Sequence, residues 1–228
     1  MADILNEMLS PSWMKALGNG FGSNAPKQTI AQASTNSGEV INDWRVRLAV
    51  PSQFRNSEIL NPLGSHMIFP FTPTIILGHS ANYTQIAPTH SNYPFQSYRN
   101  SEIQQITITG EFISENAEDA KYWLAAVHFL RTMTKMFYGD TGAPPPISRL
   151  SGYGRHVFDR VPVVITNFTT DLLGDNDYIK CVVDGKDNYV PVSSTITVTA
   201  SPTYARALVS QFTLKDFADG KLSDKGFI

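Results

Sequence analysis

The sequence predicts an α+β protein that is mainly β, with one long helix placed among antiparallel strands. Residues 117–138 contain no Gly or Pro and place apolar side chains at helical spacing, which indicates a helix. Residues 102–113 and 193–200 alternate polar and apolar side chains, which is typical of half-buried strands. Roughly seven or eight strands with one inserted helix predict an antiparallel sandwich or small barrel that carries the helix.

The helical segment has clear start and stop signals. Asn116 is expected to cap its first turn, with Asp119 at the third helical position, and Gly139 is expected to close it. The apolar arc is wider than the roughly 100° stripe of an ordinary surface helix. Either the same subunit or a neighbouring one is therefore expected to cover it. The residues placed in the core or at a subunit interface are Trp123, Val127, Leu130, Met133 and Phe137.

The opposite side of this helix carries a basic stripe formed by Lys121, Arg131 and Lys135. Cations are favoured near a helix C-terminus, where Lys135 lies. We expect the stripe to face outward, toward solvent or toward an acidic partner.

The other elements follow from alternation and from turn residues. Strands are expected over 44–50, 74–77, 80–86 (the hairpin partner of 74–77), 102–113, 161–168 and 193–200. Irregular segments are expected over 51–72 and over 140–160, which is rich in Pro and Gly, and 90–100 is expected to be a loop with an edge segment. An acidic hairpin is expected over 171–187, and a last strand or extension over 208–217.

The chain divides into three parts. Residues 1–43 form an arm with short helices over 1–17 and a linker rich in Gly, Ser and Asn, residues 44–217 form the domain, and residues 218–228 form a tail. In the arm, Ile4, Leu5, Met8 and Leu9 share one helical face. This face is expected to dock on a partner or to fold onto the chain's own domain.

Composition and motifs argue against several functions. The net charge of −2 gives no general affinity for nucleic acid, and the single cysteine, Cys181, excludes an intrachain disulfide. No apolar run is long enough to insert into a membrane. The histidine spacings match no metal motif, so no metal, cofactor or catalytic residue is expected. Two weak alternatives are a hydrolase that uses Ser80 with a histidine and a calcium-binding turn at Asp175–Asp177.

One strand face is rich in hydroxyl groups. Its residues are Gln105, Thr107, Thr109 and Glu111, joined by Thr195, Thr197 and Thr199 of the later strand. Such a face is either a solvated outer surface or the wall of a wet channel. Because proteins hold nucleic acid mainly through Lys and Arg on phosphate, a wall of hydroxyls and occasional carboxylates would let a polyanion slide past.

The order of these parts resembles a known family. The segments that carry the resemblance are QITITGEFI (105–113), the helix over 116–139, PPPISRLSGYG (144–154), VPVVITNF (161–168), DNDYI (175–179) and VSSTITVTASP (192–202). In this order they resemble the tail-tube fold proteins of contractile-tailed phages (myoviruses), above all the tube-initiator proteins at the junction of baseplate and tail tube.

The resemblance implies a structural virion protein without catalysis or cofactor. It implies a homohexameric ring that initiates tail-tube polymerisation and bounds a channel through which DNA passes, with the hydroxyl-rich face toward the lumen. The implied partners are the adjacent tube ring, baseplate hub proteins and sheath or wedge proteins, in a virion assembled in the host cytoplasm. The alternatives are a major tail-tube or tail-completion protein and a small-ligand-binding β-barrel with Trp44 or Trp123 lining its pocket.

Overall fold

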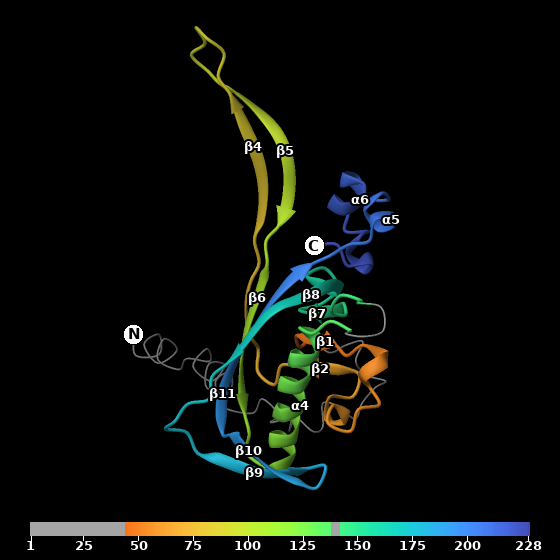
Figure 1. Cartoon of the computed structure of the whole chain (residues 1–228). Helices are drawn as coiled ribbons and strands as arrows, with labels where there is room; N and C mark the ends of the chain where they lie inside the picture. The colour runs from red at the N-terminus through yellow and green to blue at the C-terminus, as the bar shows by residue number, and fades with distance from the viewer. Residues whose placement is uncertain (1–43, 138–141) are drawn as a thin grey trace, which may run out of the picture.

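A computed structural model describes residues 44–137 and 142–228. It shows a mainly β α+β fold in which an antiparallel sheet of seven strands packs on one main helix (Figure 1). The strand order in this sheet is β2-β1-β7-β8-β11-β6-β3. The bounds in that order are β2 (His66–Ile68), β1 (Arg47–Ala49), β7 (Ser148–Gly152), β8 (Phe158–Thr170), β11 (Ser193–Pro202), β6 (Ile106–Ile113) and β3 (Thr74–Ile76).

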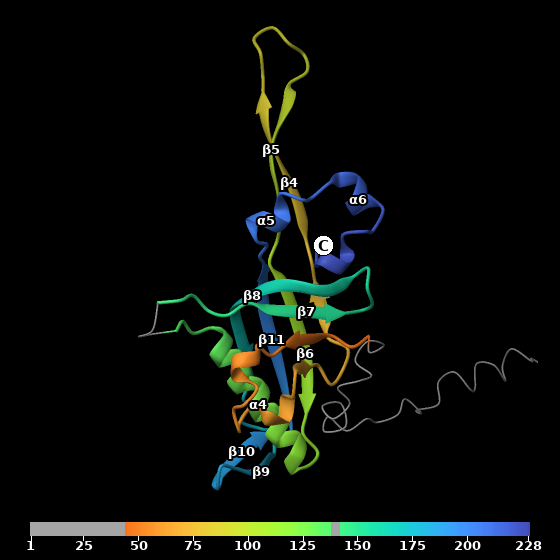
Figure 2. The ribbon, with the colours of Figure 1, turned by 90° about the vertical axis from the view of Figure 1, so that its right-hand side faces the viewer.

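Two separate hairpins complete the β structure. One consists of β9 (Tyr178–Val183) and β10 (Lys186–Pro191), joined by Asp184 and Gly185, which both have positive φ. An Asp-Gly pair with two positive φ values is the usual chemistry of a two-residue hairpin turn. The other hairpin consists of β4 (His79–Ile86) and β5 (Phe95–Ile103), which pair with each other and project far beyond the sheet (Figures 1 and 2). We call residues 79–103 the arm, as distinct from the N-terminal arm expected over residues 1–43.

The main helix, α4 (Ala117–Met133), begins as the sequence predicts. The Asn116 side chain accepts hydrogen bonds from the backbone N–H groups of Glu118 and Asp119, both at 2.9 Å. Asp119 is buried and accepts from the N–H of Glu115 at 3.3 Å. Burial raises the pKa of Asp119, against the opposing effect of that hydrogen bond.

The helix ends earlier than predicted. Thr134 has left the helical conformation, and its hydroxyl donates to the carbonyl of Arg131. Phe137 forms a bridge with Ala143 and stacks on Phe54, so it is half-buried outside the helix. Gly139, the predicted closing residue, lies outside the described residues.

The chain itself covers the wide apolar arc of α4. Trp123, Val127, Leu130 and Met133 are all buried in one core with residues of the sheet. Cys181 and Val190 of the β9–β10 hairpin and Leu63 of η3 (Asn61–Leu63) also belong to this core. The Tyr122 hydroxyl joins α4 to β2, since it donates to the carbonyl of Ile68 and accepts from its N–H. The arc therefore gives no argument for a neighbouring subunit at these four residues.

The seven-stranded sheet is open. Its edge strands β2 and β3 do not pair with each other within the described residues, so the sheet is not closed into a barrel. It is strongly twisted, and its β2-β1-β7 end lies across the direction of β6 and β11 (Figure 2). The sandwich or barrel of the sequence prediction is thus replaced by one twisted sheet that partly surrounds α4.

Several predicted strands have different extents or partners. Residues 80–86 pair with β5 rather than with β3, and much of the 90–100 segment expected to be a loop belongs to β5. The 51–72 segment contains β2, η2 (Ser52–Phe54) and η3, and the 140–160 segment contains β7 and the start of β8. The acidic hairpin extends to Pro191.

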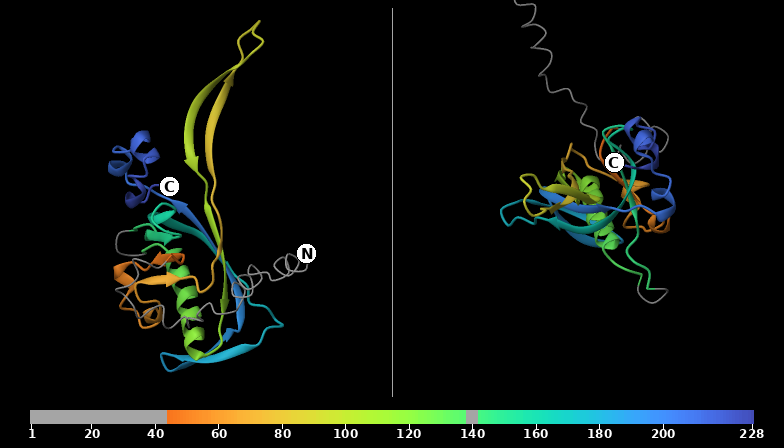
Figure 3. Two further views of the ribbon diagram at one scale, coloured as in Figure 1. Left: turned by 180° about the vertical axis from the view of Figure 1, so that it is seen from behind. Right: turned by 90° about the horizontal axis from the view of Figure 1, so that it is seen from above.

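The C-terminal region is helical, which corrects the strand expected over 208–217. It contains α5 (Arg206–Val209), α6 (Leu214–Ala218) and η4 (Ser223–Lys225). The Thr213 side chain caps α6 by accepting from the N–H of Asp216. The expected boundary between residues 217 and 218 falls inside α6. Seen from behind, this region lies at the end of β11, on the side of the sheet that carries α4 (Figure 3).

Gly110 provides a test of core packing. It lies on the core face of β6, where an added Cβ would stand 2.4 Å from Cδ1 of the fully buried Phe69. We expect Gly110→Ala to lower the free energy of unfolding by about 1–3 kcal/mol, the usual cost of overpacking. Gly174→Ala is the matched control, because nothing lies within 4 Å of its added Cβ. Urea denaturation measures both variants, and equal stability of the two would contradict this packing.

His66 gives the fold a predicted dependence on pH. Burial, followed by the nearby charges of Arg47 and Arg55, lowers the pKa of His66 to about 4 from 6.5. The unfolded chain therefore binds the proton first, so stability present above pH 6.5 is lost as pH falls toward 4. In His66→Gln, urea denaturation should show a smaller loss of stability over this range than in the parent chain. The exposed His79→Gln serves as control, and an unchanged pH profile in His66→Gln would refute the assignment.

Candidate functional site

The candidate site is the sheet face opposite α4, together with the sheet edges and the arm beside it. Side chains alternate between the two faces of β6. Because Ile106, Ile108 and Phe112 are buried in the core, the odd-numbered residues lie on the opposite face. Along β11, Ile196 and Val198 face the core in the same manner. The strand residues Thr107, Thr109, Glu111, Thr195, Thr197 and Thr199 therefore share one face, away from the helix.

The strand register aligns these side chains in rows. Thr74, Thr109, Thr197 and Thr169 are successive partners across β3, β6, β11 and β8. A second row contains Ile76, Thr107, Thr199 and Asn167, and Glu111 pairs with Thr195. The hydroxyl oxygens of Thr109 and Thr197 are 3.2 Å apart. We call these ten residues the hydroxyl face.

The hydroxyl face carries one charge, the carboxylate of Glu111, and no Lys or Arg among its ten residues. Its threonines are half-buried or exposed, which fits a wetted sheet surface and not a dry core. Gln105, which the sequence analysis placed on the same face as these threonines, precedes β6 and is exposed. Such a surface offers hydrogen bonds to water but no cation that could hold a phosphate.

Two strand edges beside the hydroxyl face are open in the described part of the chain. On one side, β3 pairs with β6 alone and β4 pairs with β5 alone. On the other side, β7 pairs only with residues 158–163 of β8, so residues 164–170 of β8 pair with β11 alone. Unpaired N–H and C=O groups along an edge are a template for strand addition. The sheet thus presents one open edge on each side of the hydroxyl face.

The arm is almost entirely exposed and carries large apolar side chains. Tyr83 and Tyr98 pair across its two strands with ring centroids 5.6 Å apart, and Ile86 is the partner of Phe95. At the tip, Tyr93 is 82% exposed. A two-stranded hairpin alone is marginally stable in water, and exposed apolar surface of this kind marks an interaction site. Sequence reasoning missed the arm, although the aromatic and β-branched residues at positions 83, 86, 95 and 98 are a strand signal.

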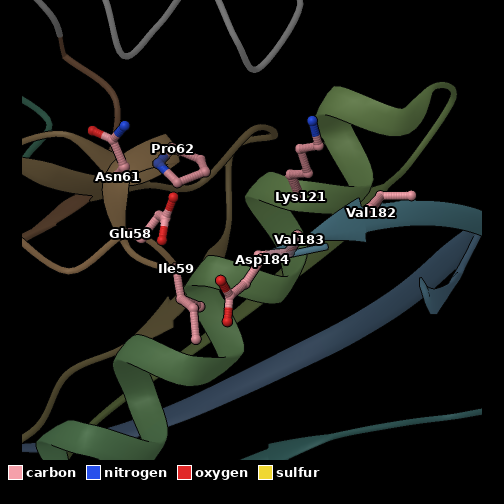
Figure 4. A pocket seen from close by; sticks show the side chains of 8 residues that line it. All are labelled: Glu58, Ile59, Asn61, Pro62, Lys121, Val182, Val183 and Asp184. Carbon is pink, nitrogen blue, oxygen red and sulfur yellow. The ribbon is translucent and has the colours of Figure 1, made fainter. Parts of the chain in front are cut away.

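The basic stripe is split by the structure. Arg131 and Lys135 are exposed, whereas Lys121 is half-buried. Lys121 lines a hollow of about 230 Å³ between the chain that precedes η3 and the turn of the β9–β10 hairpin (Figure 4). The carboxylates of Glu58 and Asp184 line the same hollow. It is smaller than the roughly 300–1,000 Å³ of typical small-molecule sites.

The residues of the two weaker alternatives, Ser80 and the turn at Asp175–Asp177, take part in local hydrogen bonds. The Ser80 hydroxyl on the arm donates to the carboxylate of Glu102 at 3.3 Å. The Asn176 side chain donates to the carbonyl of Ser193 in the turn before β9. Within residues 44–137 and 142–228, no group of three His, Cys, Asp or Glu side chains could hold a metal ion. No helix in these ranges is long and apolar enough to cross a membrane.

No family model matches the chain, and no curated protein sequence matches it.

Proposed function

We propose that this chain is a structural subunit of a six-membered ring at the junction between the baseplate and the tail tube of a contractile-tailed phage. The observation that supports the proposal most is the pair of open antiparallel edges that flank the hydroxyl face. The resemblance of the sequence to tube-initiator proteins supplies the ring size and the place in the virion.

The two edges are different surfaces of one subunit. When the β3 and β4 edge of one copy meets the 164–170 edge of the next copy, the contact is heterologous, and repetition of such a contact gives a ring or a helical filament. Ring closure would pair both of these edges at once in every copy. It also gives the arm further strands to pair with, and a sheet of three or more strands has the stability that an isolated hairpin lacks.

In such a ring the hydroxyl face would bound the lumen. Every copy would contribute the same threonine rows, and the single carboxylate per subunit would repel a polyanion. DNA would then pass without being held, because affinity for nucleic acid comes mainly from Lys and Arg on phosphate. The helix α4, on the other side of the sheet, would face outward with Arg131 and Lys135 available to sheath or wedge proteins. The arm would reach an adjacent tube ring or hub protein.

The same surfaces would serve a major tail-tube or tail-completion protein. In contrast, a ligand-binding β-barrel is disfavoured. The sheet is open, Trp123 lies in the core with its indole N–H bonded to Ser194, and Trp44 lies against Tyr153 at the surface.

Electron microscopy of the assembled particle tests the proposal. We expect six copies around the central axis at the end of the tube, with the rows of Thr109 and Thr107 toward the channel. A position away from the axis, a ring of another order, or a lumen lined by α4 would refute it.

A further inference from the structure

The β2-β1-β7 end of the sheet carries basic side chains on the face opposite the core. Leu48 pairs with both Met67 and Leu150, and these three side chains are fully buried. Successive residues of a strand point to opposite faces. His66 and Arg149, each one residue before a buried partner of Leu48, therefore lie on the other face. Arg149 is exposed and His66 is half-buried.

Ala49 lies between these two side chains. It pairs with His66, and the register of β1 with β7 continues from it to Arg149, so a small residue separates two longer ones. Neighbouring strands are about 4.8 Å apart, which puts the Cα atoms of His66 and Arg149 about 10 Å from each other. Arg47 lies two residues before Ala49 on the same face, about 7 Å along the strand.

Arg55 adds a further guanidinium group on the His66 side of this row. Its Nε donates to the carbonyl of Val50 at 3.0 Å, directly after the end of β1. Burial, followed by the charges of Arg47 and Arg55, lowers the pKa of His66 to about 4, so both guanidinium groups lie near this imidazole. At neutral pH the imidazole itself is uncharged. We call Arg47, Arg55, His66 and Arg149 the cationic cluster.

Arg55 and Arg149 form no ion pair with a carboxylate of the described residues. The strands β1, β2 and β7 contain no Asp or Glu. Glu58, three residues after Arg55, lines the hollow that contains Lys121. The cluster is thus a local concentration of positive charge on a chain whose net charge is −2.

We propose that the cationic cluster binds an acidic segment of a partner protein. A planar guanidinium group binds a carboxylate through two parallel hydrogen bonds, so Arg is well suited to hold Asp and Glu at an interface. In an extended peptide, alternate side chains lie on one side about 7 Å apart, which is the scale of the cluster. The inference concerns the single subunit and does not depend on the ring.

Nucleic acid is a less favourable partner for this surface. Affinity for DNA comes from Lys and Arg contacts to many successive phosphates, whereas the cluster carries three guanidinium groups. The net charge of −2 also gives no long-range attraction for a polyanion. A short acidic peptide needs only a few carboxylates within reach of the cluster.

Fluorescence anisotropy with the full-length protein tests the proposal. The probe is a fluorescein-labelled hexaglutamate peptide, and hexaglutamine is its uncharged control. We expect saturable binding of hexaglutamate that weakens as salt is raised, and no binding of hexaglutamine. Arg149→Gln should weaken the affinity about two- to fivefold, the effect of one exposed ion pair, and its combination with Arg55→Gln about tenfold.

Arg206→Gln is the matched control, because Arg206 is an exposed arginine of α5 outside the cluster. Its affinity for hexaglutamate should equal that of the parent chain. The Arg149 side chain forms no hydrogen bond within the described residues, so the single variant should fold even if loss of the Arg55 bond disturbs the double variant. Failure of hexaglutamate to bind, or equal affinities of Arg149→Gln and Arg206→Gln, would overturn the proposal. Tighter binding of a DNA duplex than of hexaglutamate would overturn the choice of partner.

Discussion

If the chain forms the proposed ring, a subunit without the arm should fold but should no longer enter that ring. The change is the replacement of residues 79–104 by Asn-Gly, a short turn that joins β3 to β6 directly. The arm strands pair only with each other, and the arm contributes no residue to the hydrophobic core. We therefore expect the melting temperature to shift by only a few degrees. Ring formation should be abolished, because the change removes the greater part of one open edge.

The measurement is incorporation into particles in infected cells that lack the wild-type protein. This readout is needed because the proposed ring would assemble on a preformed hub, which the isolated subunit lacks. Asn92→Ser, a polar exchange at the exposed arm tip, is the control and should support normal assembly. Normal tails with the shortened subunit would refute the role of the arm, whereas circular dichroism would reveal a general loss of folding.

The elements that bury one face were predictable from the sequence. The alternation expected over 102–113 and 193–200 identifies β6 and β11 and both of their faces, since a core on one side leaves a period-two pattern. The expected start at residue 102 is wrong, because residues 102–103 belong to β5 and β6 begins at Ile106. Asn116 likewise marks the start of α4. Which strands are neighbours was not predictable, because pairing of β11 with both β6 and β8 depends on long-range packing that no local pattern records.

The arm and the helical C-terminal region were not predicted, for different reasons. The arm has no buried face, so Gln96, Ser97 and Asn100 show no alternation and resemble a loop. In the C-terminal region, the apolar residues over 208–217 suggested a strand, but the Thr213 cap with Asp216 three residues later is a helix signal. The wide apolar arc of α4 suggested assembly, yet the β9–β10 hairpin covers it within the chain. For the candidate site, the shared threonine face was predictable, and the open edges beside it were not.

Trp123→Ala should be the most destabilising substitution in α4. The side chain is only 6% exposed, and its indole N–H donates to the Ser194 hydroxyl of β11 at 2.6 Å. Its removal leaves a cavity between helix and sheet and deprives the buried Ser194 of its partner, so we expect a loss of about 3–5 kcal/mol in the free energy of unfolding.

Three matched variants divide this loss into its parts when urea denaturation is measured at pH 7. Trp123→Phe keeps most of the packing and should cost less than Trp123→Ala. Ser194→Ala leaves the indole N–H buried without a partner, at a cost of about 1–3 kcal/mol. Trp44→Ala removes an indole that is 55% exposed and should cost under about 1 kcal/mol. If Trp123→Ala cost no more than Trp44→Ala, the helix could not be held to the sheet through this side chain, and the outward orientation of Arg131 and Lys135 would lose its structural basis.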